Sequence, residues 1–536
     1  MIYNETEIIP QGDLNALEWE GVPEVDSLGA RIDQAQAFRV RTKEELARVI
    51  EAAREANVIL RPGGAFTSSK AFVAPPASWM EAHRKKGVWV VSFDHRGEFG
   101  EIKVDMDREE VTVGAAVSLQ QMDDAVRERT VIDNGVRRPR LGNVMRITTM
   151  DASTVATALG SGGVSDAGES SISAMKGAQW VDGRGVLHNE NYDPTDYFSS
   201  ASSSFARVDH RRVGMEMSGR GGPFGIGTQA RFKLVEAPVA DFTAVFPFVG
   251  SAEEVREQLA DFTVVMNRRS KELKMEQAPV QLMALELMDR AAIDVAAEGM
   301  GRRPFSFTEE PSLVVIADFA QYDWWDEGTR PWADSDALLH AFEHCLVPPA
   351  FAESVQPIFG SSGRKEVSAF RLQGPEHLRA LLKKRKHEVP QVGSESTDWA
   401  VDPRDPALVQ WYFEQFFRLH NQVQSAVYRQ ALYGHLFNRL DLHHRVVMDD
   451  PAALKAHQSR SIAFGQQVAQ RQKDGERVRV RGEKVENPFD RRDSLTISRL
   501  REGAHQDSNR RLLKRVDPSG LFKDRAAERW GGRYDY

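Results

Sequence analysis

Three short segments rich in glycine and hydroxyl residues are the first places where this sequence could bind an anionic ligand. Residues 61–69 read RPGGAFTSS and directly follow an apolar run at residues 58–60. Residues 160–168 read GSGGVSDAG, and residues 221–228 read GGPFGIGT. Glycines let the backbone approach a ligand closely, and successive N–H groups in a turn form a concave anion site. Each segment alone is equally typical of an ordinary turn, and none has the spacing of a Walker or G-x-G-x-x-G loop. Together they favour a surface that binds a pyrophosphate.

A second group of candidates consists of histidines and an arginine in the later half of the chain. Residues 434–444, GHLFNRLDLHH, contain His435, His443 and His444. Imidazoles can act as bases or bind a divalent ion, but a polar strand end with surface histidines has the same pattern. Arg385 lies in the basic run 383–387, where it could hold a substrate carboxylate through two parallel bonds or belong to a solvated helix face.

The elements that would position these residues alternate between helices and strands. Capping boxes at residues 42–45 and 118–121 predict two helix starts, because a hydroxyl and a Glu or Gln stand three residues apart. Apolar runs at residues 88–93 and 110–117 predict strands between them. Pro238 marks a domain boundary.

After that boundary the pattern changes to longer helices mixed with strands. A capping box at residues 251–254 begins a helix, and residues 313–316 read as a buried strand. We expect residues 282–288 to be a Met-rich helix and residues 407–436 to be a long aromatic helix. This mixture predicts an α+β layer domain.

Composition limits the class of protein. The chain has 536 residues, 41% hydrophobic and 28% charged, which is typical of a globular protein. A net charge of -8 gives nucleic acid no global attraction, and the arginines after residue 471 alternate with acids, as on a solvated face. With one cysteine, Cys345, a disulfide framework or a cysteine-based metal site is excluded, and a cytoplasmic location is the default. We expect no membrane span and no signal peptide.

The order of the motifs resembles the flavin-binding domain of the vanillyl-alcohol oxidase/p-cresol methylhydroxylase superfamily. The matching landmarks are the 61–69 loop, VTVGAAV at residues 111–117, GAQWVDGRG at residues 177–185 and GIGT at residues 225–228. Later segments resemble the C-terminal domain of FAD-linked oxidases, closest to the D-lactate, glycolate and D-2-hydroxyglutarate dehydrogenase branch. These segments are LELMD at residues 285–289, LLKKRKHEVP at 381–390, STDWAV at 396–401 and KRVDPSGL at 514–521.

The resemblance implies an α+β fold with a two-part FAD-binding domain of the p-cresol methylhydroxylase type and a ferredoxin-like cap domain for the substrate. The implied divisions are an N-terminal arm at residues 1–34, the FAD-binding domain at 35–238, the cap at 239–455 and a C-terminal segment at 456–536 that returns to the FAD-binding domain.

FAD is the implied cofactor. The residues expected to contact it are Pro62, Gly63, Gly64, Ala65, Phe66, Thr67, Ser68, Gly160, Gly163, Ser165, Gly168, Gly225, Ile226 and Thr228. Many relatives attach FAD to a histidine after the Gly-Gly pair, and because Ala65 stands there we expect noncovalent FAD. The sequence also departs from the family at residues 151–153, Asp-Ala-Ser, where relatives have a glycine pair.

Metal-dependent relatives carry a G-H-x-x-D-G-N-x-H run, which is altered here. His435 matches its first histidine, His443 falls one residue late, and the later Glu-His-Gly element is replaced around Glu483. We therefore expect no metal, with these three residues as the remaining candidate ligands. The same stretch resembles the R-E-M-H-H segment of phenol oxidases, in which a paired histidine can hold the flavin covalently. Attachment at His443 or His444 therefore stays open.

The implied reaction is FAD-dependent oxidation of a hydroxyl-bearing carbon, with a 2-hydroxy acid as the leading substrate. His435, His443 and His444 are the candidate bases and Arg385 the candidate carboxylate clamp, while Arg481 corresponds to an arginine that stabilises phenolate in phenol oxidases. The alternatives are an aromatic alcohol or phenol oxidase, or a flavoprotein without net redox turnover, like the alkyl-transferring glycerone-phosphate synthases. The partners are a small-molecule substrate and an electron acceptor (oxygen, a quinone or an electron-transfer protein), with a homodimer left open.

Overall fold

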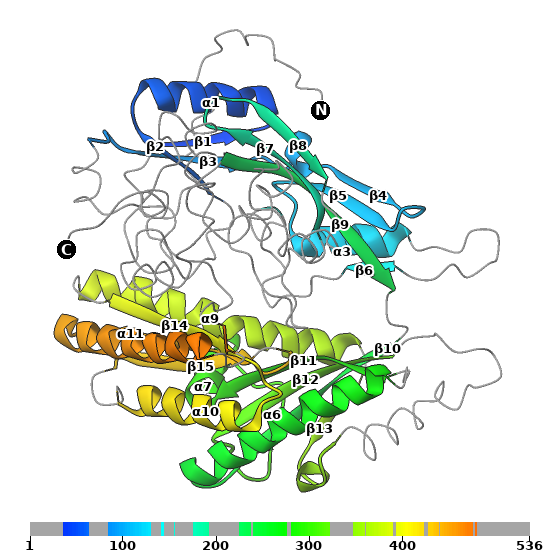
Figure 1. Ribbon diagram of the computed structural model, residues 1–536, viewed down its shortest axis with the longest axis vertical. Coiled ribbons are helices and arrows are strands. Elements are labelled where there is room, and N and C mark those ends of the chain that lie inside the picture. Colours follow the sequence, from blue (N-terminus) through cyan, green and yellow to red (C-terminus); the bar gives the residue numbers. More distant parts are fainter. Residues whose placement is uncertain are drawn as a thin grey trace.

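The computed structural model describes residues 36–63, 84–129, 141–143, 155, 175–191, 225–236, 240–275, 280–321, 347–359, 361–389, 393–422, 427–438, 440–474 and 478–479. These residues form two units, drawn one above the other in Figure 1. The N-terminal unit contains two small sheets, and the C-terminal unit is built on one eight-stranded sheet.

The first sheet of the N-terminal unit has three parallel strands in the order β1-β3-β2. The strands are β1 (Gln36–Val40), β2 (Ile59–Pro62) and β3 (Val88–Phe93). Helix α1 (Lys43–Glu55) begins at the expected capping box, in which Thr42 and Glu45 each accept the other's backbone N–H. Its apolar stripe is buried, so α1 covers the sheet.

The second sheet is antiparallel, with five strands in the order β4-β5-β9-β7-β8 and β6 beside β9. Its strands are β4 (Ile102–Asp105), β5 (Glu110–Gly114), β6 (Leu141–Asn143), β7 (Met175–Asp182), β8 (Leu187–Asn191) and β9 (Gly225–Glu236). Helix α3 (Leu119–Arg129) begins at the second expected capping box, Ser118 with Gln121. A one-turn helix, η2 (Glu98–Gly100), packs on Gly114, where a Cβ would stand 2.2 Å from the Phe99 oxygen.

The eight-stranded sheet, here called the cap sheet, runs β13-β10-β12-β11-β15-β16-β14-β17, and every adjacent pair is antiparallel. Its strands are β10 (Ala240–Phe248), β11 (Val280–Asp289), β12 (Leu313–Gln321), β13 (Gln356–Phe359), β14 (Gly393–Val401), β15 (Arg429–His435), β16 (Leu440–Met448) and β17 (Val478–Arg479).

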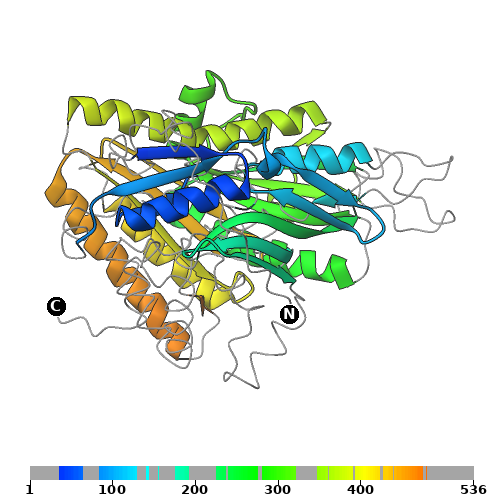
Figure 2. The same cartoon turned by 90° about the horizontal axis from the view of Figure 1, so that it is seen from above.

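Helices cover both faces of the cap sheet, as Figure 2 shows. On one face lie α7 (Arg290–Met300) and α9 (Ser361–Glu388). On the other lie α6 (Ala252–Met275), α10 (Pro406–Asn421) and α11 (Pro451–Lys473), with the short η5 (Pro349–Phe351). None of the described helices is long and apolar enough to cross a membrane.

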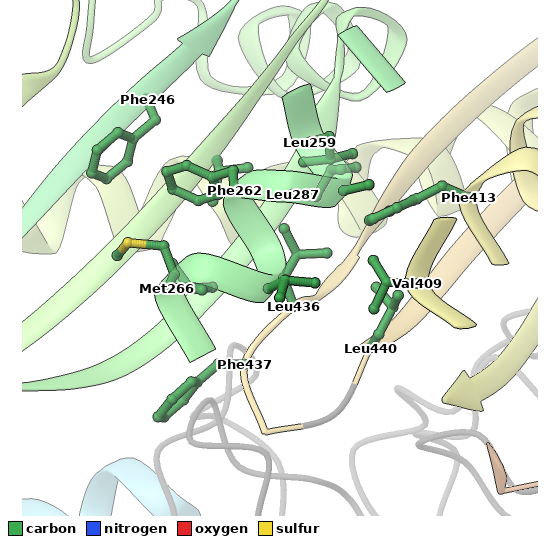
Figure 3. Close-up of a cluster of buried hydrophobic side chains, with 14 of the residues drawn as sticks. Phe246, Leu259, Phe262, Met266, Leu287, Val409, Phe413, Leu436, Phe437 and Leu440 are labelled. Atoms are coloured by element: carbon green, nitrogen blue, oxygen red, sulfur yellow. The ribbon is translucent and has the colours of Figure 1, made fainter. Parts of the chain in front are cut away.

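The largest core lies between the cap sheet and the helices α6 and α10 (Figure 3). Phe262 from α6, Leu287 from β11 and Phe413 from α10 meet there with almost no exposed surface. Full burial of one such side chain stabilises the fold by about 1.5–3 kcal/mol, so this layer anchors the sheet that carries the candidate site.

Two expected helices are corrected by the structure. Residues 282–288 belong to strand β11, so the helix prediction for them is wrong. A central strand that is buried on both faces has a continuous apolar run instead of strict alternation, and such a run resembles a buried helix. The aromatic helix ends at Asn421, and residues 429–435 form β15. The expected boundary at residue 456 falls inside α11, and β17 pairs with β14, so the cap unit continues to Arg479.

Candidate functional site

The β15–β16 hairpin divides the three candidate histidines between the two faces of the cap sheet. In its register His435 pairs with Asp441, Tyr433 with His443 and Leu432 with His444. Because side chains alternate along a strand, His435 and His443 share the α7/α9 face and His444 faces the other way. The rings of His435 and His443 lie 5.8 Å apart at 89°. All three histidines are buried, so the surface-histidine interpretation is wrong.

Gly434 lets the two strands approach closely beside His435. A Cβ at this position would stand 2.3 Å from the Asp441 oxygen and 2.7 Å from the Leu442 Cα. Both atoms belong to the backbone, which has little freedom to move. A glycine is therefore required for the hairpin geometry that places His435 next to β11.

A buried ion network begins at His435 and extends across the α7/α9 face. His435 Nδ1 lies 3.5 Å from Glu286 Oε1. Arg371, on α9, donates from Nε to Glu286 Oε2 at 2.8 Å, and its Nη2 pairs with Glu286 Oε1. Its Nη1 donates to Asp318 Oδ2 at 3.0 Å, and Asp318 Oδ1 accepts from the Thr243 hydroxyl at 2.6 Å. The network thus connects β10, β12, β11 and β15 through one guanidinium.

The network keeps Glu286 ionised although it is fully enclosed. Burial alone would raise the pKa of Glu286, but the Arg371 charge and the His435 contact outweigh burial, so the pKa lies below its usual range. A buried carboxylate that stays charged can orient an imidazole and stabilise positive charge on it. The pair of Glu286 and His435 therefore has the arrangement of a base held by a carboxylate.

His444 belongs to a second cluster, on the α10/α11 face. Its ring lies 4.7 Å from His420 of α10 and 5.3 Å from His457 of α11. Burial lowers the pKa of His420 to about 4 and that of His457 to about 4, and it lowers the pKa of His444 well below 6.5, with the two neighbouring histidines adding to the effect. These imidazoles are neutral core groups, and the structure separates His444 from the other two candidate bases.

Arg385, the expected carboxylate clamp, lies in a group of ion pairs. Its Nη2 pairs with Asp449 at 2.6 Å and its Nη1 with Glu388 at 2.7 Å, and its guanidinium lies 4.7 Å from the centre of the Tyr428 ring. Tyr428 and Asp449 flank the open end of the β15–β16 hairpin, whereas His435 stands at its turn. Arg385 therefore ties α9 to the far end of the hairpin, and the two carboxylates beside it belong to the chain itself.

The described part of the expected FAD surface consists of strand ends. The Gly63 N–H donates to the Val91 oxygen at 2.8 Å, which holds the exit of β2 beside β3. Thr228 donates from Oγ1 to the Gln179 oxygen at 3.1 Å, and the Thr228 oxygen accepts from the Ala115 N–H at 2.9 Å. Pro62 ends β2, and Gly225 and Ile226 begin β9. These strands place the starts and ends of two expected loops, while contact with FAD stays a prediction.

The remaining expected contacts and site residues lie outside the described residues. They are Gly64, Ala65, Phe66, Thr67, Ser68, Gly160, Gly163, Ser165, Gly168, Arg481 and Glu483. Among the residues that the structure describes, no three His, Cys, Asp or Glu side chains are arranged to hold a metal ion.

The landmark GAQWVDGRG stabilises the turn of the β7–β8 hairpin. Asp182 accepts from the backbone N–H of Arg184 at 2.8 Å and of Val186 at 3.1 Å, and from the Arg184 guanidinium at 2.6 Å. It also lies 3.0 Å from His188 Nε2, and the His188 ring stacks on Trp180 at 4.1 Å. This motif therefore fixes the β7–β8 turn beside β9 and needs no ligand to explain it.

Sequence reasoning did not assign a site role to Glu286, Asp318 or Arg371. A signal was present, because Glu286 and Asp318 each interrupt an apolar run within a central strand, and Arg371 interrupts a buried helix face. Charged residues are rarely fully buried unless they are paired. The sequence did not show that these residues pair, because Arg371 is 85 residues from Glu286 and 53 residues from Asp318.

No protein-family model matches the sequence, and no curated protein matches it. Solved structures do match. The chain is similar to 4-ethylphenol oxidase from Gulosibacter chungangensis in complex with isoeugenol, with a TM-score of 0.57 and 12% identity over 91% of this chain and 87% of that one. It is similar to xylooligosaccharide oxidase from Myceliophthora thermophila C1 in complex with xylobiose, with a TM-score of 0.56 and 13% identity over 94% of this chain and 93% of that one.

A third match is alkyldihydroxyacetonephosphate synthase, with a TM-score of 0.56 and 11% identity over 92% of this chain and 78% of that one. At these identities the likeness establishes the fold alone. The chain has the two-unit fold of the p-cresol methylhydroxylase type of oxidase, as the order of its sequence landmarks predicted.

Proposed function

We propose that this protein is an FAD-linked oxidoreductase that oxidises a hydroxyl-bearing compound. The fold supports this proposal, because two of the similar structures are named as oxidases of a phenol and of an oligosaccharide. Since one fold can host unrelated functions, the residues of the site have to carry the argument.

The observation that carries it is the buried pair of Glu286 and His435. Oxidation of an alcohol or phenol requires a base for the hydroxyl proton, and an imidazole held by a carboxylate is suited to that task. Bound FAD would supply the two-electron acceptor. His435 would take the hydroxyl proton, and Glu286 would stabilise the positive charge that then develops on the ring.

The charges around this pair favour a neutral substrate. Arg371 lies between two carboxylates, Glu286 and Asp318, so the network carries a net negative charge. A substrate carboxylate placed beside it would be repelled and would have to be desolvated. Arg385, the expected clamp for a 2-hydroxy acid, is occupied by Asp449 and Glu388. We therefore favour phenols, aromatic alcohols or sugar hydroxyls over 2-hydroxy acids.

A visible spectrum of the purified protein, before and after acid precipitation, tests the cofactor. We expect flavin bands that stay in the supernatant, because Ala65 replaces the histidine that relatives use for attachment. A colourless protein that FAD does not reconstitute would contradict the proposal.

Anaerobic addition of substrates then tests the reaction. The panel contains phenols, aromatic alcohols, oligosaccharides and D-2-hydroxy acids, and we expect bleaching by a neutral member. His435→Gln should abolish bleaching, whereas His95→Gln, at an exposed position in the other unit, should not. Flavin that no hydroxyl compound bleaches would instead favour a function without net redox turnover.

A further inference from the structure

The polar residues on the α7/α9 face form a row that begins at His435. Glu286 is directly opposite His435 across β11 and β15, and Thr243 is directly opposite Asp318 across β10 and β12. Arg371 reaches down from α9 and joins the two pairs. Its side chain is only 4% exposed, so the guanidinium has exchanged water for these carboxylates.

We propose that Arg371 is a positioning residue, which acts through Glu286 to fix His435 as the tautomer with hydrogen on Nδ1. The inference rests on the proposed function for its kinetic consequence, while the tautomer itself follows from the network alone.

The tautomer follows from what each partner can donate or accept. An ionised carboxylate only accepts hydrogen bonds, and Glu286 Oε1 faces His435 Nδ1 at 3.5 Å. At this ion-pair distance the charge of the carboxylate favours the tautomer with the hydrogen on the nearer nitrogen, Nδ1. Nε2 then carries the lone pair, which is the nitrogen that can take a substrate proton.

Arg371 keeps Glu286 in the form that this arrangement needs. Without a nearby cation, burial favours the protonated carboxylic acid. A protonated Glu286 would become a donor toward Nδ1 and would reverse the tautomer of His435. Because Arg371 binds both oxygens of Glu286, it also holds the orientation of the carboxylate.

Asp318 and Thr243 hold the other end of the guanidinium. Asp318 accepts from Arg371 Nη1 on one oxygen and from Thr243 on the other. The neighbouring strands bring further titratable or charged groups to this face, and α7 and α9 bring the pair of Glu298 and His377. Among the described residues they include Tyr433 on β15 and Asp441, His443 and Arg445 on β16. Asp441 is directly opposite His435, so it is the matched carboxylate for comparison with Glu286.

Nitrogen NMR of protein labelled with ¹⁵N-histidine tests the tautomer directly, and His435→Gln identifies the signal. In the wild type at pH 7.5 we expect the neutral Nδ1–H form to predominate. In Arg371→Met and in Glu286→Met that form should fall to a minority, while Arg371→Lys, which keeps the charge, should restore most of it. Asp441→Asn should change the tautomer less than Glu286→Met does.

The outcomes separate the two proposals. A wild type with hydrogen on Nε2, or a folded Arg371→Met that keeps the Nδ1–H form, would overturn the positioning role. If Arg371→Met does not fold, Glu286→Met decides, since it leaves Arg371 paired with Asp318.

Kinetics of flavin reduction give the second readout. We expect Arg371→Met to lower the limiting rate of flavin reduction by roughly 10²-fold, the lower range for loss of general-base catalysis, and to change the dissociation constant of the substrate by less than about threefold. A variant that raises the dissociation constant alone would contradict the role. If the wild type binds no flavin, the proposed function is wrong. The NMR experiment then still tests the tautomer of His435, because it does not depend on flavin.

Discussion

His443 and His444 are neighbours in the sequence and lie on opposite faces of the cap sheet. The His443 ring stands 5.8 Å from that of His435, whereas the His444 ring stands 5.3 Å from that of His457. Because successive side chains of a strand point to opposite faces, one of these adjacent histidines belongs to the candidate site and the other to the core.

This separation predicts which histidine could hold a flavin. We expect acid to release the flavin from the wild type. Should flavin instead precipitate with the protein, His443→Ala should free it and His444→Ala should not, because only His443 shares the face of His435. Absorbance of the acid supernatant measures this. Release by His444→Ala alone would show that the assignment of the faces is wrong.

The three core histidines predict a loss of stability in mild acid. The pKa values of His420 and His457 are lowered by burial to about 4, so between pH 6.5 and 4 the unfolded chain binds more protons than the folded one. The free energy of unfolding should therefore fall as the pH falls through this window, by on the order of 3 kcal/mol for each of these two histidines.

Urea unfolding at pH 7.5, 6.5, 5.5 and 4.5 checks this dependence. His457→Leu removes one titrating group and should make it shallower, whereas His95→Gln, at an exposed position, should leave it nearly unchanged. The same dependence of the free energy of unfolding on pH in the wild type and both variants would contradict the prediction.

We expect Asp289 to stabilise the fold through the hydrogen bonds that its side-chain oxygen accepts more than through its charge. Its Oδ1 accepts the N–H of Ala292 at 2.7 Å, which caps α7, and the N–H of Leu432 at 3.0 Å on β15. Asp289→Ala should cost about 2–3 kcal/mol, the sum of a lost cap and a buried N–H without a partner. Asp289→Asn keeps an acceptor and should cost under about 1 kcal/mol at low pH.

The pH dependence distinguishes the charge from the cap. Burial raises the pKa of Asp289 to about 7, so its contribution to stability is lost as the pH rises from 3.8 toward 7. The stability of Asp289→Asn relative to the wild type should therefore rise over that range. A relative stability that falls with rising pH would refute the raised pKa.

Two glycines give a matched test of the hairpin geometry. Gly434→Ala places a Cβ 2.3 Å from the Asp441 oxygen, so the strands must separate and His435 must move. Gly87→Ala, just before β3, meets its nearest atom at 3.9 Å and needs no left-handed backbone, so it should change the stability by less than about 1 kcal/mol. Thermal unfolding and flavin reduction measure both variants, and Gly434→Ala should be impaired in each. A fully active Gly434→Ala would show that the close approach is not needed.

Arg385 should be dispensable for substrate binding. Arg385→Met breaks the ion pairs with Asp449 and Glu388 on a partly exposed helix face, where such pairs contribute little. We expect KM and kcat for the preferred substrate to change by less than about twofold. A large rise in KM confined to carboxylate substrates would restore the clamp role.

Local signals in the sequence predicted local structure well. The hydroxyl and the Glu or Gln of each capping box, such as Thr42 with Glu45 and Ser251 with Glu254, lie three residues apart and satisfy each other without distant partners. The order of the glycine-rich motifs likewise predicted the fold, and the similar solved structures confirm that fold.

The tertiary structure decided the identity of the candidate site. Strand β11 was misassigned because a strand buried on both faces has no alternating pattern, and the position of Glu286 beside His435 depends on its register. Arg371 reaches Glu286 only after α9 packs on the cap sheet. A single sequence records which residues are charged, but the energy of a buried charge depends on its neighbours in space, and those neighbours come from distant parts of the chain.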